Sequence, residues 1–294
     1  MTTAVPPLPA FADVLSAAAR IAPHAQQTPV LRSQSLDDIA GCALHFKCEN
    51  LQRVGAFKFR GACNAIFALD DETAARGILT QSSGNHGAAV ALVSRLRGIP
   101  ATVVVPEGSP AVKLAAISGY GARVVRCAAT MAARNAAATA LAEETGAHLV
   151  HPFDDMHVIA GQGTVALEFL RSEPELDALL APVGGGGLLS GCALTARALR
   201  PDLQICDGLR GHLAPRTLAL LQTHIDGIFT VDDDVVMQAM RLLWERLKLV
   251  VEPSGAIAFA AVLRNRERFA GRRVGIVVSG GNVDLNTLPW QVHA

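Results

Sequence analysis

From Thr80 onward, short apolar runs alternate with longer stretches whose apolar residues recur at helical spacing. This alternation is typical of βαβ units, because two parallel strands need a crossover connection, usually a helix. The predicted elements are a helix over 87–97, a strand over 101–105, a helix over 110–118, a strand over 122–127, a helix over 130–145 and a strand over 148–151. The sequence therefore predicts an α/β fold of mainly parallel open sheets with helices on both faces.

The alternation continues on both sides of this region, and glycine clusters punctuate it. The further predicted elements are a helix over 11–21, an extended stretch over 28–33, a strand over 43–49, a helix over 61–69, a strand over 179–183, a helix ending at 200 and a strand over 274–278. The glycine clusters lie at 84–87, 161–163, 184–187 and 280–281. Open α/β sheets bind ligands outside the carboxyl ends of their strands. We therefore expect these clusters to be turns that surround one crevice.

The charge balance limits the classes of partner. The chain has 26 Lys and Arg against 26 Asp and Glu, so its formal net charge is zero. Without a basic excess it has no electrostatic means of holding nucleic acid or an acidic membrane surface. Hydrophobic residues make up 50% and charged residues 18%, which argues against disorder, and 294 residues allow one large domain or two lobes.

The cysteines and the N-terminus bear on the compartment. Residues 1–10 contain three prolines and no basic residue, which is unlike a signal peptide. No uninterrupted apolar run reaches the roughly 18 residues that a membrane-spanning helix needs. The six cysteines show no CxxC spacing, so we expect reduced cysteines in a cytoplasmic protein and no structural zinc.

Only four of the basic residues are lysines, at positions 47, 58, 113 and 248. Lys58 stands between Phe57 and Phe59 in the stretch GAFKFRGA. An amine in apolar surroundings has a lowered pKa and becomes a competent nucleophile towards aldehydes. The simpler alternative is a lysine whose stem lies along apolar surface while its amine stays in water. The residues around Lys58 favour the nucleophile.

Two glycine-rich turns have the chemistry of anion sites. In SSGNHG, Gly84 and Gly87 allow a tight turn whose backbone N–H groups can hold a carboxylate, while Asn85 can donate to a ring oxygen. The alternative is a simple capped loop. The four glycines at 184–187 follow an apolar strand and each costs about 0.5–1 kcal/mol relative to alanine in regular structure. Binding of a phosphate at a helix N-terminus gives a reason for that cost, and a flexible loop is the alternative.

Together and in this order, the motifs resemble those of the fold-type II pyridoxal-phosphate enzymes, whose fold is like that of the tryptophan synthase β-subunit. The resemblance is to serine/threonine dehydratases, serine racemases and threo-3-hydroxyaspartate dehydratases, and it spans nearly the whole chain. The matching stretches include TPVLRS, GAFKFRGA, SSGNHG, VVPEGSPAVK, HPFDDMHVIAGQGT, VGGGGLLSG, VVEPSGA and VSGGNVDL. The combination is far more specific than any single motif.

The resemblance implies a role for each cofactor residue. Lys58 would bond covalently to the cofactor aldehyde, with Phe57 on one face of the ring and Gly208 on the other. Asn85 would bond the ring hydroxyl oxygen, and Ser279 would face the pyridine nitrogen and leave it largely uncharged. The phosphate would be held by the glycine run and the residue after it, namely Gly184, Gly185, Gly186, Gly187 and Leu188.

The resemblance also implies a set of substrate residues, which are Ser82, Ser83, Asn85, His86 and Arg134. Ser83 matches the position that acts in racemases as the base on the opposite face, and it could equally be a hydroxyl that only binds the carboxylate. His86 is better explained as part of the loop scaffold. Arg134 matches a cation near a distal carboxylate of the substrate, although a solvated helix face is the simpler interpretation.

The implied activity is β-elimination from a small hydroxy amino acid such as threonine or serine, giving a 2-oxo acid and ammonia. The substrate amine would displace Lys58, whose amine then takes the α-proton while the β-hydroxyl leaves, protonated by the cofactor phosphate. Ala56 stands where many dehydratases have serine, so racemisation of an amino acid or dehydration of threo-3-hydroxyaspartate is the alternative. A dinucleotide-dependent oxidoreductase is disfavoured, because no acidic residue follows a GxGxxG turn.

The sequence departs from the family pattern after Cys206, which runs directly into Asp207. The family continues there into a segment of about thirty residues that carries an acidic metal ligand. We therefore predict no metal site, and a protein that binds pyridoxal phosphate without turnover is an alternative of another class. We expect a homodimer with a larger lobe over 1–75 and 155–294 and a smaller lobe over 76–154, and no regulatory domain after Asn282.

Overall fold

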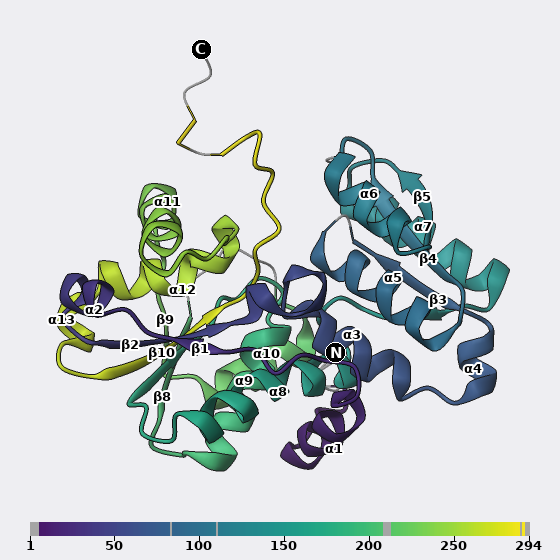
Figure 1. Ribbon diagram of the computed structural model, residues 1–294. Coiled ribbons are helices and arrows are strands. Elements are labelled where there is room, and N and C mark those ends of the chain that lie inside the picture. The colour runs from purple at the N-terminus through teal and green to yellow at the C-terminus, as the bar shows by residue number, and fades with distance from the viewer. Residues whose placement is uncertain (1–5, 83, 110, 208–212, 289, 292–294) are drawn as a thin grey trace.

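The computed structural model describes residues 6–82, 84–109, 111–207, 213–288 and 290–291. Within these ranges the strands form two sheets (Figure 1). The large sheet has the order β1-β2-β10-β7-β8-β9, with β1 Val30–Leu31, β2 Ala43–Cys48, β7 Ala178–Leu180, β8 Gln204–Asp207, β9 Gly227–Ile228 and β10 Arg273–Val278. The small sheet has the order β5-β4-β3-β6, with β3 Ile78–Gln81, β4 Ala101–Pro106, β5 Arg123–Cys127 and β6 His148–Leu149.

All strand pairs are parallel except β1 with β2, and helices connect the parallel strands. The first helices are α1 Phe11–Ile21, α2 Gln34–Ala40, α3 Lys58–Phe67, α4 Asp71–Ala75, α5 Asn85–Arg97, α6 Ala111–Gly119 and α7 Met131–Thr145. The later ones are α8 Met156–Ser172, α9 Gly187–Leu199, α10 Pro215–His224, α11 Asp233–Leu242, α12 Pro253–Arg264 and α13 Arg266–Phe269. Short 3₁₀ turns cover Glu49–Leu51 and Arg53–Gly55, and a π-turn covers Leu243–Leu247. The predicted fold class is confirmed.

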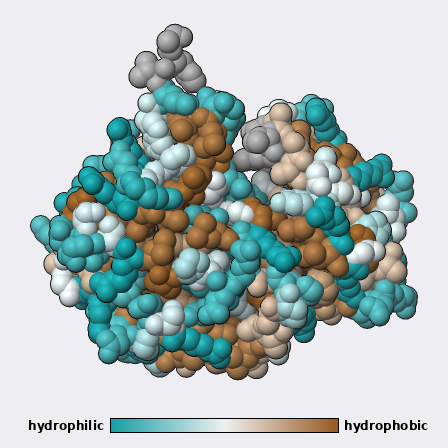
Figure 2. All heavy atoms as spheres, viewed as in Figure 1, coloured by the Kyte–Doolittle hydropathy of each residue, from teal (hydrophilic) through white to brown (hydrophobic). Residues whose placement is uncertain are grey.

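Helices cover both faces of the large sheet, which explains why its strands are apolar at nearly every position (Figure 1). Along β10, Ile276 and Val278 pack with residues of α2, α11 and α12, whereas Val277 packs with α8 and α9 on the other face. Successive side chains of a strand point to opposite faces, so both faces need apolar residues. Figure 2 shows that hydrophobic side chains also reach the surface in a band over this part of the molecule.

The small sheet is built in the same way. Val103 and Val105 of β4 pack with α5 and α6, whereas Val104 packs with Ala138 of α7. None of the described helices is long and apolar enough to cross a bilayer.

The glycine cluster at 161–163 is not a turn, and the prediction that it borders the crevice is wrong. It lies within α8, where a Cβ on Gly161 would stand 2.7 Å from the carbonyl oxygen of Arg60, and one on Gly163 would stand 2.9 Å from that of Gly191. These glycines allow α8 to approach α3 and α9 closely. The helix expected from Gly61 begins at Lys58, so the lysine lies in its first turn.

Candidate active site

A cavity of about 530 Å³ lies where strands of both sheets end. Gln81 and Ser82 reach it at the end of β3, Gly184 after β7, and Ser279 directly after β10. These are carboxyl ends of parallel strands, where open α/β sheets bind ligands. The volume is in the range of sites for small ligands and cofactors. Two of the four predicted glycine clusters, 84–87 and 184–187, thus contribute to one crevice, and Ser279, which precedes a third cluster, lines it as well.

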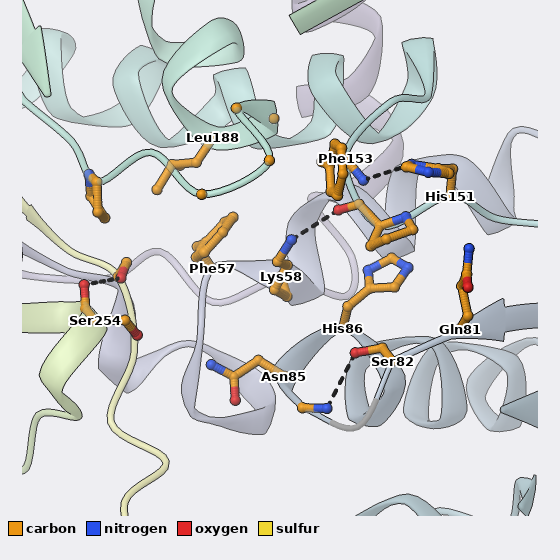
Figure 3. Close-up of a pocket in the computed structure, with 18 of the residues that line it drawn as sticks. Phe57, Lys58, Gln81, Ser82, Asn85, His86, His151, Phe153, Leu188 and Ser254 are labelled. Atoms are coloured by element: carbon orange, nitrogen blue, oxygen red, sulfur yellow. Dashed lines mark hydrogen bonds between the residues drawn. The ribbon is translucent and has the colours of Figure 1, made fainter. Parts of the chain in front are cut away.

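Lys58 points into this cavity from the first turn of α3 (Figure 3). Its Nζ donates to the carbonyl oxygen of Pro152 at 2.8 Å and lies 5.1 Å from the centre of the Phe57 ring. Burial lowers the pKa of the Lys58 amine to about 8. The neutral form, which a nucleophile requires, is therefore a minority near physiological pH but far more populated than for an ordinary lysine.

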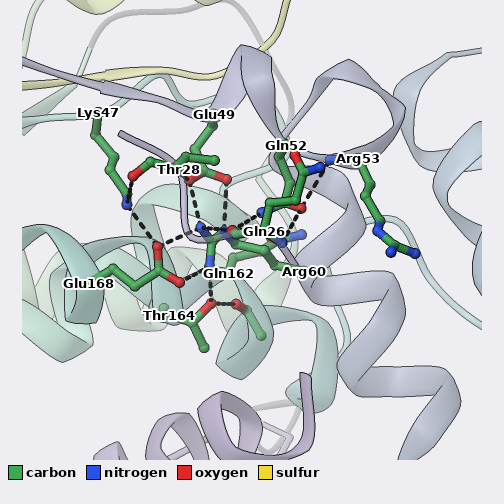
Figure 4. Close-up of polar contacts among 12 residues, drawn as sticks. Gln26, Thr28, Lys47, Glu49, Gln52, Arg53, Arg60, Gln162, Thr164 and Glu168 are labelled. Atoms are coloured by element: carbon green, nitrogen blue, oxygen red, sulfur yellow. Dashed lines mark hydrogen bonds and ion pairs between the residues drawn. The ribbon is translucent and has the colours of Figure 1, made fainter. Parts of the chain in front are cut away.

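A network of buried charges fixes the helix that carries Lys58 (Figure 4). Arg60 is fully buried, and its guanidinium bonds both Glu49 at 2.8 Å and Glu168 at 2.7 Å. Lys47 of β2 donates to the same Glu168 at 2.7 Å, and Thr28 donates to Glu49 at 2.6 Å. These bonds join the first turn of α3 to strand β2 and helix α8. They meet at Arg60, which is two residues after Lys58.

The SSGNHG turn lies beside Lys58 at the start of α5. The backbone N–H of Gly84 donates to the Ser82 hydroxyl at 3.2 Å, and a Cβ on Gly87 would stand 2.6 Å from the carbonyl oxygen of Ser82. Asn85 and His86 follow and line the cavity with Ser82. Ser83, the predicted second base, lies outside the described residues.

His86 is buried, and its Nε2 lies 3.4 Å from the carbonyl oxygen of Val150. Burial, and after it the charge of Lys58, lowers the pKa of His86 to about 3. The imidazole is therefore neutral at physiological pH. Its geometry fits the predicted scaffold role.

The glycines at 184–187 precede and begin α9, and all of them line the cavity together with Leu188. A Cβ on Gly185 would stand 2.2 Å from the Phe153 ring, and one on Gly186 would stand 2.7 Å from Thr217. Within the run, only the Cβ position of Gly184 has no atom of the described residues within 4 Å. Packing thus requires glycine at 185 and 186, while the first N–H groups of α9, which have no partner within the helix, favour an anion.

Ser279 is buried beside this run, and its Oγ donates to the carbonyl oxygen of Ser254 at 3.3 Å. Because a hydroxyl hydrogen can rotate, the same O–H can instead donate to an acceptor in the cavity. Gly208, predicted on the opposite face of the ring from Phe57, lies outside the described residues.

Part of the cavity wall comes from the end of β3 in the small sheet and from α7. Arg134 lines the cavity there, rather than standing on a fully solvated helix face, and its buried Nε has no hydrogen-bond partner within the described ranges. Gln81 donates to Asn135 at 2.9 Å, and the Oε1 atom of Gln81 is likewise buried and unpartnered among the described residues. Among the described residues, this wall therefore has a donor and an acceptor without partners.

Sequence reasoning assigned no role to several residues that line the cavity or bond to its wall. Glu252 stands in the quoted stretch VVEPSGA and hydrogen bonds Asn85. Asn282 stands in the quoted stretch VSGGNVDL and bonds the same Asn85 side chain. His151 accepts the backbone N–H of Asp154 at 2.8 Å and lies against the Phe153 ring. Phe153 and His151 fall in the stretch HPFDDM, which gave the only available signal.

The assembled groups fit pyridoxal phosphate. A buried amine with a lowered pKa can bond an aldehyde, and the Phe57 ring beside it offers a flat apolar contact. The start of α9 with its open space at Gly184 suits a phosphate, and the Ser279 hydroxyl suits a ring nitrogen. The residues described supply a partner for each polar part of that cofactor.

Comparison with known proteins agrees with this fit. The family model described as "Pyridoxal-phosphate dependent enzyme" matches residues 21–206 and 203–280. The chain is 42% identical to a serine racemase of Dictyostelium discoideum, over 94% of this chain and 95% of the relative. It is 40% identical to a beta-hydroxyaspartate dehydratase of Paracoccus denitrificans, over 96% of this chain and 99% of that relative. The solved structure of maize serine racemase superposes with a TM-score of 0.93 at 41% identity, covering 96% of each chain.

The same comparisons bear on the shortening after Cys206. The alignment with the Dictyostelium relative has 309 positions, more than the 294 residues of this chain, so the relative has residues that this chain lacks. The family match divides into two segments at 203–206, where the shortening is predicted. Among the described residues, no group of three His, Cys, Asp or Glu side chains is placed to hold a metal ion. The match and the geometry agree that the chain belongs to the fold-type II pyridoxal-phosphate-dependent enzymes, in company with serine racemases and hydroxyaspartate dehydratases.

Proposed function

We propose that this enzyme eliminates water from 3-hydroxyaspartate, a small hydroxy amino acid with a second carboxylate. Arg134 carries the proposal, because its side chain lines the cavity and a guanidinium there can donate charge-assisted hydrogen bonds to an anionic group of the substrate. The hydroxyaspartate dehydratase among the relatives supports it. The comparisons favour this reaction, or racemisation, over the expected dehydration of threonine or serine.

Racemisation of serine is the second candidate. The identity of 42% to one serine racemase and the TM-score of 0.93 to another support it. It requires a second base across the substrate plane from Lys58, and Ser83 is the sequence-based candidate for that base.

Bound pyridoxal phosphate supplies an electron sink for the negative charge that develops at the substrate Cα. The residues of this chain do the rest. The Lys58 amine accepts the proton from Cα and the Cβ–O bond breaks. The leaving hydroxyl takes up one proton, which balances the one accepted by Lys58, so that one water is lost overall. Hydrolysis of the resulting enamine gives a 2-oxo acid and ammonia. Arg134 orients the distal carboxylate, and the start of α9 holds the cofactor phosphate.

Product analysis with threo-3-hydroxyaspartate, L-serine and L-threonine tests the proposal. We expect 2-oxo acid and ammonia from all three, with the highest kcat/KM for hydroxyaspartate. Formation of D-serine from L-serine, with no 2-oxo acid formed from hydroxyaspartate, would instead establish the racemase. Uptake of pyridoxal phosphate without any product would establish a binding protein that has lost turnover.

We propose that the enzyme is a homodimer. Leu51 and Val250 are 45% and 47% exposed, and the bond of 3.1 Å from Asn50 to the carbonyl oxygen of Val250 brings their segments together. An exposed apolar patch of this kind supports an interface. Sedimentation equilibrium should give twice the chain mass, and Val250→Asp should shift the protein to monomer. A monomer at all concentrations contradicts the dimer.

We propose the two-lobe division as well, with 76–154 as the smaller lobe set into 1–75 and 155–294. The strands of the small sheet all lie between Ile78 and Leu149, which supports these bounds. Limited proteolysis should cut first near 76 and 154. First cuts within β4 or β7 would contradict the division.

We propose a reducing compartment, such as the cytoplasm, for this enzyme. The six cysteines are not joined in disulfides, and all except Cys127 are buried. Burial raises the pKa of the Cys48 and Cys63 thiols to about 12, so they are protonated and unreactive at neutral pH. A thiol reagent should therefore label native protein slowly at all positions but Cys127.

A further inference from the structure

The side-chain amide of Asn85 is held at both ends. Its Nδ2 donates to Oε1 of Glu252 at 2.7 Å, although the two residues are 167 positions apart. Its Oδ1 accepts from Nδ2 of Asn282 at 2.9 Å. Nδ2 of Asn282 also donates to the carbonyl oxygen of Val54 at 2.6 Å. Asn85 therefore belongs to a chain of bonds that runs from a backbone carbonyl to a carboxylate.

Donor and acceptor chemistry fixes the direction of this chain. The carbonyl of Val54 and the carboxylate of Glu252 only accept hydrogen bonds. The amide nitrogen of Asn282 must therefore face Val54, and the amide nitrogen of Asn85 must face Glu252. Of the two N–H groups of Asn85, one is engaged by Glu252, and no described residue takes the other. The orientation of that remaining N–H is set by Glu252.

Neighbouring glycines leave room for this arrangement. A Cβ on Gly280 would stand 2.4 Å from Oε1 of Glu252 and 3.2 Å from Nδ2 of Asn85. A Cβ on Gly55 would stand 2.6 Å from Oδ1 of Asn282. The backbone N–H of Glu252 also donates to the carbonyl oxygen of Gly280 at 3.1 Å. Glu252 is buried and lines the cavity, so its carboxylate has a fixed place in the wall.

We propose that Glu252 is a positioning residue for the cofactor, acting through Asn85. Its carboxylate holds the Asn85 amide so that the remaining N–H is presented to the ring oxygen of pyridoxal phosphate. Asn282 holds the other end of the amide. The inference rests on the proposed assignment of Asn85 to that oxygen. The hydrogen bond between Asn85 and Glu252 also joins α5, next to the small sheet, to the start of α12, next to the large sheet.

A double-mutant cycle on cofactor binding tests this role, with pyridoxal phosphate titrated into the apo-protein and followed by absorption. Glu252→Ala should raise the apparent Kd about tenfold, as expected for loss of a hydrogen bond to a charged group. It should also change the absorption spectrum of the bound cofactor as Asn85→Ala does. Glu252→Gln keeps an acceptor oxygen and should stay within about twofold of wild type. The double variant Glu252→Ala/Asn85→Ala should bind no more weakly than Asn85→Ala alone.

Asp232→Ala is the matched control, because Asp232 is the exposed acidic residue that precedes α11 as Glu252 precedes α12. It should leave affinity and spectrum unchanged. Should Glu252→Ala fail to fold, Asn282→Ala must produce the same weakening and the same spectrum. Wild-type affinity and spectrum in the Glu252→Ala variant would overturn this inference and leave the proposed function standing. Additive losses of affinity in the double variant would do the same. Failure of the wild type to bind pyridoxal phosphate would overturn the proposed function, and this inference with it.

Discussion

Lys58 and Pro152 are joined across 94 residues by a hydrogen bond of 2.8 Å from the lysine Nζ to the proline carbonyl oxygen. The bond holds the amine at the wall of the cavity, in front of the Phe57 ring (Figure 3). Because burial brings the pKa of this amine to about 8, its charge can be changed in an accessible pH range.

The rate of cofactor capture should follow this ionisation. Only the neutral amine attacks an aldehyde, and its fraction rises as pH approaches the pKa and levels off above it. With the pKa of Lys58 lowered from 10.5 to about 8, the rate at which apo-protein takes up pyridoxal phosphate should rise from pH 6 to 8 and then plateau. Stopped-flow absorption measures it. A rate that still rises tenfold per pH unit above pH 9 would contradict the lowered pKa.

Replacing Arg60 by methionine should destabilise the protein strongly. The change leaves the buried Glu49 carboxylate without its guanidinium partner, and breaking a buried ion pair costs about 3–5 kcal/mol. Urea denaturation measures the loss. Arg76→Met, which removes an exposed pair with Glu72, is the control and should change stability little. Equal stability of the two variants would show that the network is not structural.

Gly161→Ala should lower stability by about 1–3 kcal/mol, because the new Cβ meets backbone atoms of α3. Gly119→Ala is the matched control, since Gly119 is also helical but has no atom of the described residues within 4 Å of its Cβ position. Thermal unfolding compares the two. If Gly161→Ala is as stable as Gly119→Ala, the close approach of α8 to α3 is wrong.

Arg134→Ala should change substrate preference. Loss of a charge-assisted bond to the distal carboxylate should lower kcat/KM for threo-3-hydroxyaspartate about 10- to 100-fold, with little change for L-serine. The exposed Arg126 of β5 offers the control variant Arg126→Ala, which should leave both substrates unaffected. An equal loss for both substrates would argue against a subsite at Arg134.

The sequence predicted the fold class and the cavity because their signals are local. The apolar runs and the turns at 84–87 and 184–187 each reflect chemistry within a few neighbouring residues. The cluster at 161–163 misled, because glycine serves a turn and a close helix contact equally well. Only the approach of α8 to Arg60 and Gly191 distinguishes the two.

Glu252 was missed for a similar reason. A glutamate before Pro253 at a helix start has a sufficient local explanation, since acidic residues are favoured there. Its bond to Asn85 exists only once residues 167 positions apart are brought together. The cavity-facing position of Arg134 likewise depends on how α7 packs, which an Ala-rich helix does not reveal.

Borohydride reduction of the protein loaded with pyridoxal phosphate tests the central claim most directly. The wild type should show an absorption band at the edge of the visible range that borohydride abolishes, and peptide mapping should find the label on Lys58. Lys58→Ala should lack the reducible band while it keeps its fold. A reducible band that persists in Lys58→Ala, or a label on Lys47, Lys113 or Lys248, would contradict the account.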